Sequence, residues 1–121
     1  MDTHQVGRRF EELATEHLLS HGWTILARNY RFGRKEIDLI AARGSTVAFV
    51  EVKGRRGSGY GHPLEAITWK KRREIAHVAR HWLHENGGGW AVVRFDAIAV
   101  WDLTDGSPEV EHTPDAWRLT R

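Results

Sequence analysis

Residues 46–53 are the segment that most restricts the fold, because they are almost continuously apolar and yet end in charged residues. Their content of valine and phenylalanine indicates a β-strand at the centre of a sheet. Side chains alternate between the two faces of a strand, so Val47, Phe49, Glu51 and Lys53 share one face. A buried charge is costly unless it is paired or bound to a metal. Glu51 and Lys53 are therefore the first candidates for a functional site.

Hydrophobic periodicity predicts helices and strands on both sides of this strand. Apolar residues recur at helical spacing over residues 6–21 and again from Pro63 to about residue 85. Strand patterns cover residues 23–30, 36–42 and 90–101, and the chain becomes polar from about residue 105. The order α-β-β-β-α-β predicts an α/β fold in which helices cover a mixed sheet. We expect one domain over residues 1–121 with a polar C-terminal tail.

The composition, 40% hydrophobic and 28% charged, is typical of a globular protein. The absence of cysteine excludes disulfides, thiolate zinc sites and cysteine nucleophiles. No apolar stretch is long enough for a signal peptide or a membrane span, so we expect a cytoplasmic protein without membrane contact. The net charge is only +2, but the basic residues cluster at 31–35, 53–56 and 70–73. Such clusters suit either a polyanion or a solvated surface.

The acids of the preceding strand strengthen the functional interpretation. Glu36 and Asp38 share one face of that strand, and in a meander they would lie near Glu51. Magnesium and manganese prefer oxygen ligands, and magnesium commonly takes one or two carboxylates with water and substrate phosphate. An isolated Glu51 and Lys53 would more simply form a surface ion pair. The additional acids favour a metal site at Asp38 and Glu51.

Helical projection adds two charged residues on or beside apolar stripes. Glu11 borders the stripe of the first helix, from which it can reach the carboxylates. Lys71 lies within the stripe of the second helix, where it either extends to solvent or contacts an anion, namely the acidic cluster or a nucleic-acid backbone. Arg94 and Asp96 share a face of the last strand, and we expect them to form an ion pair.

Other patterns are weaker. The second helix carries histidines at helical spacing, which are His77, His81 and His84, but a polar helix surface explains them better than a transition-metal site. Residues 54–61 are rich in glycine and basic and are expected to form a mobile loop. Within them, residues 57–61 lack the lysine-serine ending of a phosphate-binding loop, so they disfavour nucleotide hydrolysis and suit a flexible DNA-contacting loop. Tyr60 and Trp69 either stack on unpaired bases or belong partly to the core.

Two segments resemble the acid-bearing strands of the PD-(D/E)XK nucleases: Lys35-Glu36-Ile37-Asp38-Leu39-Ile40 and Phe49-Val50-Glu51-Val52-Lys53-Gly54-Arg55. Within that superfamily the chain resembles the bacterial YraN family, which is itself similar to archaeal Holliday-junction resolvases. The resemblance continues in the same order through Glu11 with Ala14, residues 66–71 and Arg94-Phe95-Asp96, and so covers nearly the whole chain.

This resemblance implies a restriction-endonuclease-like fold. It also implies that Asp38 and Glu51 are metal ligands, that Lys53 is the catalytic lysine and that Glu11 is an accessory acid. One departure is visible, because Lys35 stands where the family usually has glycine before the first acid of the second strand.

We therefore expect an endodeoxyribonuclease that depends on Mg²⁺ or Mn²⁺. The metal would bind Asp38, Glu51 and the carbonyl of Val52, with Lys53 beside the nucleophile and Glu36 and Glu11 in supporting roles. The residues expected to hold the DNA backbone are Arg55, Arg56, Lys71, Arg72 and Arg73. Branched or flapped DNA is the expected substrate, by analogy with resolvases.

Two alternatives remain, a nucleic-acid-binding module without catalysis and a protein-interaction domain with incidental ion pairs. The sequence leaves open whether the protein forms a homodimer and whether it requires a protein partner.

Overall fold

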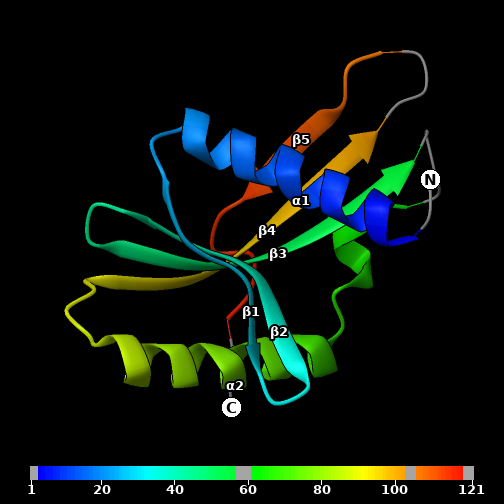
Figure 1. Ribbon diagram of the computed structural model, residues 1–121. Helices are drawn as coiled ribbons and strands as arrows, with labels where there is room; N and C mark the ends of the chain where they lie inside the picture. The colour runs from blue at the N-terminus through cyan, green and yellow to red at the C-terminus, as the bar shows by residue number, and fades with distance from the viewer. Residues whose placement is uncertain (1–2, 57–60, 103–105, 119–121) are drawn as a thin grey trace.

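The computed structural model describes residues 3–56, 61–102 and 106–118. Figure 1 shows two helices on opposite sides of a twisted sheet. The elements are α1 (Thr3–Ser20), β1 (Thr24–Phe32), β2 (Lys35–Arg43), β3 (Thr46–Arg56), the short 3₁₀ helix η1 (Pro63–Ala66), α2 (Trp69–Asn86), β4 (Val92–Asp102) and β5 (Glu109–Thr113). The strands follow the order β1-β2-β3-β4-β5, with β3 and β4 parallel and the other neighbours antiparallel.

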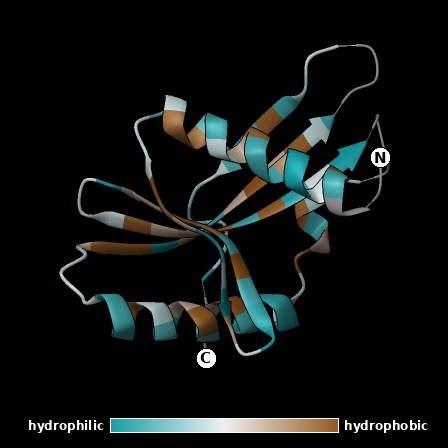
Figure 2. Ribbon diagram, viewed as in Figure 1, coloured by the Kyte–Doolittle hydropathy of each residue, from teal (hydrophilic) through white to brown (hydrophobic). Residues whose placement is uncertain are grey.

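This arrangement confirms the predicted α/β class and its α-β-β-β-α-β order, which are those expected of a restriction-endonuclease-like fold. The two faces of β3 also agree with the predicted alternation. Val47 and Phe49 belong to the core on the α2 side, whereas Ala48, Val50 and Val52 belong to the core on the α1 side. Figure 2 shows hydrophobic residues along the central strands and hydrophilic residues over much of both helices. Glu51 therefore belongs to the face that α2 covers.

The last part of β3 is longer than predicted, because the strand continues to Arg56 and includes the start of the segment expected to be a loop. Gly54 lies under α1, where a Cβ atom would collide with the ring of Phe10. Glycine therefore permits the close approach of α1 to β3. Residues 57–60 of the expected glycine-rich loop, which include Tyr60, lie outside the described residues.

The beginning of α2 also differs from the prediction. Pro63 starts η1, capped by His62, and α2 begins six residues later with Thr68 as its N-cap. The Lys71 N–H donates to the Thr68 hydroxyl at 3.1 Å, which satisfies one of the free amides at the helix start. The cap therefore sets the position of Lys71 in the first turn of α2.

The expected polar tail contains β5, which pairs with β4, followed by Trp117, which is buried. The sequence Glu-Val-Glu-His-Thr of β5 is mostly polar because this strand lies at the edge of the sheet. A strand of this kind carries too little hydrophobic alternation to be recognised from periodicity.

In the part of the chain that the structure describes, no helix has the length and apolar character needed to cross a membrane.

Candidate metal centre and nucleic-acid interface

The candidate site lies where β2 and β3 separate. The two strands pair from Arg43 with Thr46 up to Leu39 with Val50. Asp38 and Glu51 are the next residue on each strand. Beyond them the β1–β2 hairpin turns toward α2 while β3 continues beside β4 (Figure 1). The fork thus brings together two acids that are 13 positions apart in the sequence.

Asp38 is held in the fork by the backbone of β3. The Val52 N–H donates to Asp38 Oδ2 at 2.8 Å. A peptide N–H that would otherwise pair with β2 thus binds the carboxylate instead. This contact fixes one oxygen of Asp38 and orients the group toward Glu51.

Glu51 is an acid in an apolar environment. Its exposed fraction is only 3%, and its Oε2 atom has no hydrogen-bond partner among the described residues. Burial raises the pKa of Glu51, and the charge and hydrogen bond of Asp38 raise it further, to about 9. The nearby charges of Lys71 and Lys53 oppose this rise. Without a cation, the Asp38–Glu51 pair therefore retains a proton at neutral pH.

Two lysines lie beside these acids. Lys71 Nζ is 4.0 Å from Glu51 Oε2, which is close enough for an ion pair but too far for a hydrogen bond. Of the interpretations open for Lys71, contact with the acidic cluster is the one observed. Lys53 is half-buried, and its charge acts on Glu51 as predicted from their shared face of β3.

Glu11 extends from α1 toward the same fork. Burial and the charge of Asp38 raise the pKa of Glu11, although a hydrogen bond with the Asn29 side chain lowers it. Asn29 is a residue that sequence reasoning missed. In the β1–β2 register it lies opposite Asp38, and its φ of 52° is unusual for a non-glycine residue in a strand. An asparagine within an otherwise regular strand pattern was the available signal.

Glu36 lies at the outer side of the fork. Its carboxylate accepts from Arg31 at 3.3 Å, and its charge contributes to the raised pKa of Glu11. It is not among the groups that shift the pKa of Glu51. The supporting role of Glu36 stays a prediction, with Arg31 as its observed partner.

The donor set fits a hard cation with an incomplete protein shell. Within residues 3–56, 61–102 and 106–118, no group of three or more His, Asp or Glu side chains is gathered closely enough to hold a metal. Asp38 and Glu51, whose Oε2 atom takes part in no hydrogen bond with the described residues, supply two carboxylates, which is a donor number that magnesium accepts when water and phosphate complete its shell. The carbonyl of Val52 as a further ligand stays a prediction.

Comparison with known sequences identifies the family. The model of the uncharacterised protein family UPF0102 matches residues 10–100. The chain belongs to this family. The UPF0102 protein of Rhodococcus jostii (strain RHA1) is 45% identical over 112 residues, which cover 93% of this chain and 95% of that protein. The UPF0102 protein of Chlorobaculum tepidum is 46% identical over 119 residues, covering 94% and 92% of the two chains.

Among solved structures, this UPF0102 chain is similar to Archaeoglobus fulgidus Hjc, a Holliday junction resolvase, with a TM-score of 0.48 and 18% identity over 86% of this chain and 74% of that one. Pyrococcus furiosus SfsA in complex with Ca²⁺ gives a TM-score of 0.38 at 18% identity, covering 93% and 64% of the chains.

Of the predicted DNA-contacting residues of the UPF0102 chain, Lys71 contacts Glu51, and the other four fall into two groups. Arg55, Arg56 and Arg73 are exposed, as a phosphate contact requires. Arg72 is instead partly committed to the protein, because its Nε donates to the carbonyl of Ile67 at 3.1 Å and its guanidinium lies 4.9 Å from the ring of Trp69. Trp69 itself is 55% exposed, so the interpretation of this residue as partial core is wrong.

The remaining polar patterns have structural partners. His81 stacks on Phe32 with ring centroids 3.8 Å apart, and His77 lies 5.5 Å from the same ring. These two histidines thus form the surface on which the β1–β2 hairpin packs. Arg94 pairs with Asp96 at 2.8 Å, which confirms the expected ion pair.

Proposed function

We propose that this protein is a metal-dependent DNA endonuclease whose site is the fork between β2 and β3. One observation carries the proposal: Glu51, buried and with an Oε2 atom that has no hydrogen-bond partner among the described residues, lies beside Asp38 and is flanked by two lysines. Burying an acid pair is costly, and Lys71, 4.0 Å from Glu51 Oε2, offsets only part of that cost because the pKa of Glu51 is still raised, so a bound cation would stabilise the charged pair. The neighbouring lysines and the basic surface favour an anionic substrate such as a phosphodiester. A divalent metal is the cation that would suit hydrolysis of that substrate.

The carboxylates of Asp38 and Glu51 would hold Mg²⁺ or Mn²⁺. When bound, such a metal polarises a phosphate oxygen and lowers the pKa of a coordinated water. Asp38 is oriented for this purpose by the Val52 N–H. Lys53, as a fixed positive group, would stabilise the charge that develops on the phosphoryl oxygens. Lys71 would balance the charge of Glu51. The charge of Glu11 would act on Asp38 from the side of α1.

The exposed Arg55 and Arg56 at the end of β3 and Arg73 on α2 would bind the DNA backbone, which gives affinity with little sequence information. Trp69 lies on the same helix as Lys71, two residues away, and presents an exposed indole. Aromatic rings stack on unpaired bases. The exposed ring therefore favours flapped or branched DNA over a regular duplex.

A cleavage assay tests the proposal. Wild type, Asp38→Asn, Lys53→Ala and the control Lys70→Ala, whose side chain is exposed, would be incubated with a labelled duplex, a flap and a four-way junction, each with Mg²⁺, Mn²⁺ or chelator. We expect metal-dependent strand cutting that falls by about 10²–10³-fold in Lys53→Ala, as when an electrostatic stabiliser is lost. Equal cutting by Lys53→Ala and wild type, or cutting that persists in chelator, would reject this mechanism.

A nucleic-acid-binding module without catalysis is the second candidate. The small number of protein ligands at the fork and the proton retained by the acid pair favour it. It predicts salt-sensitive DNA binding with no cutting of any substrate. A protein-interaction domain, in contrast, predicts no salt-dependent DNA binding, so a filter-binding salt titration separates it from both other functions.

A further inference from the structure

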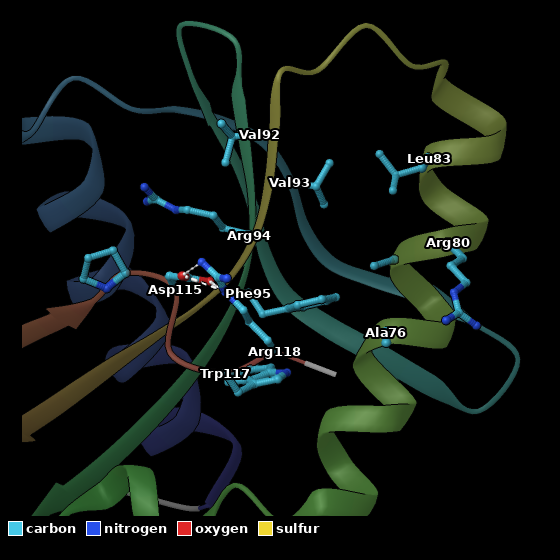
Figure 3. Close-up of a pocket in the computed structure, with 12 residues that line it drawn as sticks. Ala76, Arg80, Leu83, Val92, Val93, Arg94, Phe95, Asp115, Trp117 and Arg118 are labelled. Carbon is cyan, nitrogen blue, oxygen red and sulfur yellow. Dashed lines mark hydrogen bonds and ion pairs between the residues drawn. The ribbon is translucent and has the colours of Figure 1, made fainter. Parts of the chain in front are cut away.

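A pocket of about 740 Å³ lies away from the fork, between the C-terminal half of α2 and the start of β4 (Figure 3). Its walls include Leu83 of α2 and Val93 of β4, which face each other across the gap in Figure 3, and Trp117 lies at its floor. Val92 and Val93 are 44% and 45% exposed. Adjacent exposed valines beside an apolar hollow are typical of a binding surface.

Among the residues that the structure describes, no strand pairs with the edge of β4 beside this pocket. β5 pairs with β4 only from Ala97 to Trp101, and just before that the Phe95 carbonyl accepts from the Ala116 N–H at 2.7 Å. Backbone groups of successive strand residues point to opposite edges. Val93, two residues before Phe95, therefore directs its N–H and C=O to the same outer edge. No strand covers Val93 there within the described ranges.

The charges around the pocket are predominantly positive. Its lining contains Arg80, Arg94 and Arg118 against one acid, Asp115. Arg118 already pairs with Asp115 at 2.7 Å, and Arg94 pairs with the buried Asp96. Arg80 is exposed and has no ion pair in the part of the chain that the structure describes. The pocket thus carries excess positive charge next to its apolar floor.

We propose that this surface binds an extended acidic segment of a partner protein by adding it as a strand to β4. The partner backbone pairs with Val93, one of its apolar side chains enters the pocket between Val93 and Leu83, and an acidic side chain contacts Arg80. Strand addition of this type combines main-chain hydrogen bonds for affinity with a side-chain pocket for specificity. The surface shares no residue with the metal fork, so the inference is independent of the proposed nuclease function.

The test uses a synthetic nine-residue peptide in which glutamate alternates with valine and the central apolar residue is phenylalanine. The protein is ¹⁵N-labelled and kept in chelator, and peptide is added while amide signals are recorded. We expect shifts at Val93, Phe95 and Leu83 and at the indole N–H of Trp117, which has no hydrogen-bond partner among the described residues. The Val93 amide proton should also exchange more slowly with solvent.

Three controls identify the mode of binding. The same peptide with alternate N-methylated amides keeps the charge but cannot pair as a strand, and it should bind about tenfold more weakly or less. Val93→Asp and Arg80→Glu should each weaken binding by about fivefold or more, through lost apolar contact and reversed charge. The control Leu19→Asp, at an exposed position on α1, should bind as wild type. Circular dichroism verifies that each variant is folded.

Several results would overturn the proposal. These are equal binding of the N-methylated peptide, no binding at millimolar peptide, or shifts confined to Arg55, Arg56 and Lys71, which would indicate charge attraction to the nucleic-acid surface. Concentration-dependent shifts at Val93 without peptide, together with a dimer in light scattering, would assign the edge to a second copy of this chain. Binding of duplex DNA at these same residues would also contradict the peptide assignment.

Discussion

Glu51 connects the stability of the protein with its proposed chemistry. An acid that is only 3% exposed, beside a second acid, favours the protonated form when no cation is bound. Because the pKa of Glu51 is raised in the folded state, its contribution to stability is complete below its ordinary pKa and is lost as the pH rises toward about 9. When no cation is bound, Glu51 therefore weakens the fold at neutral pH.

Replacing Glu51 with glutamine should remove this penalty. In chelator at pH 7, Glu51→Gln should have a free energy of unfolding higher than that of wild type by up to about 3 kcal/mol. The difference should shrink toward pH 5, which urea unfolding at several pH values would measure. Addition of Mg²⁺ or Mn²⁺ should raise the Tm of wild type but not that of the variant. The control is Glu16→Gln on the exposed face of α1, and a pH-independent gain in Glu51→Gln would contradict the assignment.

Asp96 is a buried acid of the opposite kind, because its hydrogen-bond partners favour the charged form. Burial alone would raise the pKa of Asp96, but hydrogen bonds from His112, Arg94 and the Asp115 N–H lower it below the ordinary value of 3.8. These bonds join β4 to β5 and to the segment that follows it. The stabilising contribution of Asp96 is present above the ordinary pKa of an aspartate and is lost as the pH falls below about 4.

Asp96→Ala should therefore reduce the free energy of unfolding by about 3–5 kcal/mol at pH 7, since it leaves the charge of Arg94 half-buried without a partner. The loss relative to wild type should diminish as the pH falls below about 4. Asp115→Ala is the matched control, because its partner Arg118 is 78% exposed and such an exposed ion pair contributes little to stability. Similar losses in the two variants would refute the anchoring role of Asp96.

At the scale of elements, the packing of α1 on β3 depends on one glycine. Gly54 lies where any side chain would meet the ring of Phe10, and Phe10 belongs to the core between α1 and the sheet. The same helix carries Glu11, so its distance from β3 also sets the distance of this acid from the fork.

Gly54→Ala should lower the free energy of unfolding by about 1–3 kcal/mol through overpacking. If metal binding follows the fork geometry, the Mg²⁺-induced rise in Tm should also decrease. Gly7→Ala on α1 is the control, because a Cβ atom there has open space and alanine should be neutral or stabilising by about 0.5–1 kcal/mol. Thermal unfolding of the two variants would compare them directly, and equal stabilities would exclude the close-approach explanation.

At the scale of the whole molecule, the sheet supports two separate surfaces. The fork, the end of β3 and the start of α2 form a basic side with Trp69 exposed, whereas the far end of α2 and the start of β4 form the pocket with an open strand edge. If both proposals hold, this separation would allow a nucleic acid and a partner protein to bind simultaneously.

Trp69→Ala tests the nature of the nucleic acid on the basic side. Loss of base stacking, about 1–3 kcal/mol, should weaken binding of a flap or single strand by about 5- to 150-fold. Affinity for a regular duplex should change little, and Trp69→Phe should retain the preference. Fluorescence anisotropy at fixed salt, in chelator, measures both affinities. An equal loss for flap and duplex would indicate that Trp69 acts through Arg72 on the backbone contacts instead.

Hydrophobic periodicity was sufficient for most elements, because α1, β2, β3 and β4 each carry a long regular pattern. It failed at β5, whose polar edge sequence lacks that pattern, and at the start of α2, where Pro63 begins a separate turn and Thr68 is the true cap. The ends of elements depend on caps and neighbouring contacts that periodicity does not report.

For the candidate site, the sequence by itself determined which residues carry charge on apolar faces, namely Glu51, Lys53 and Lys71, since the strand and helix periods assign each side chain to a face. Only the tertiary structure decided how these faces meet. The register of β2 with β3 places Asp38 next to Glu51 at the point where the two strands separate. The irregular backbone at Asn29 brings an amide to Glu11. The open edge at Val93 likewise results from where β5 ends. Distances between elements follow from packing and register, which the linear pattern does not contain.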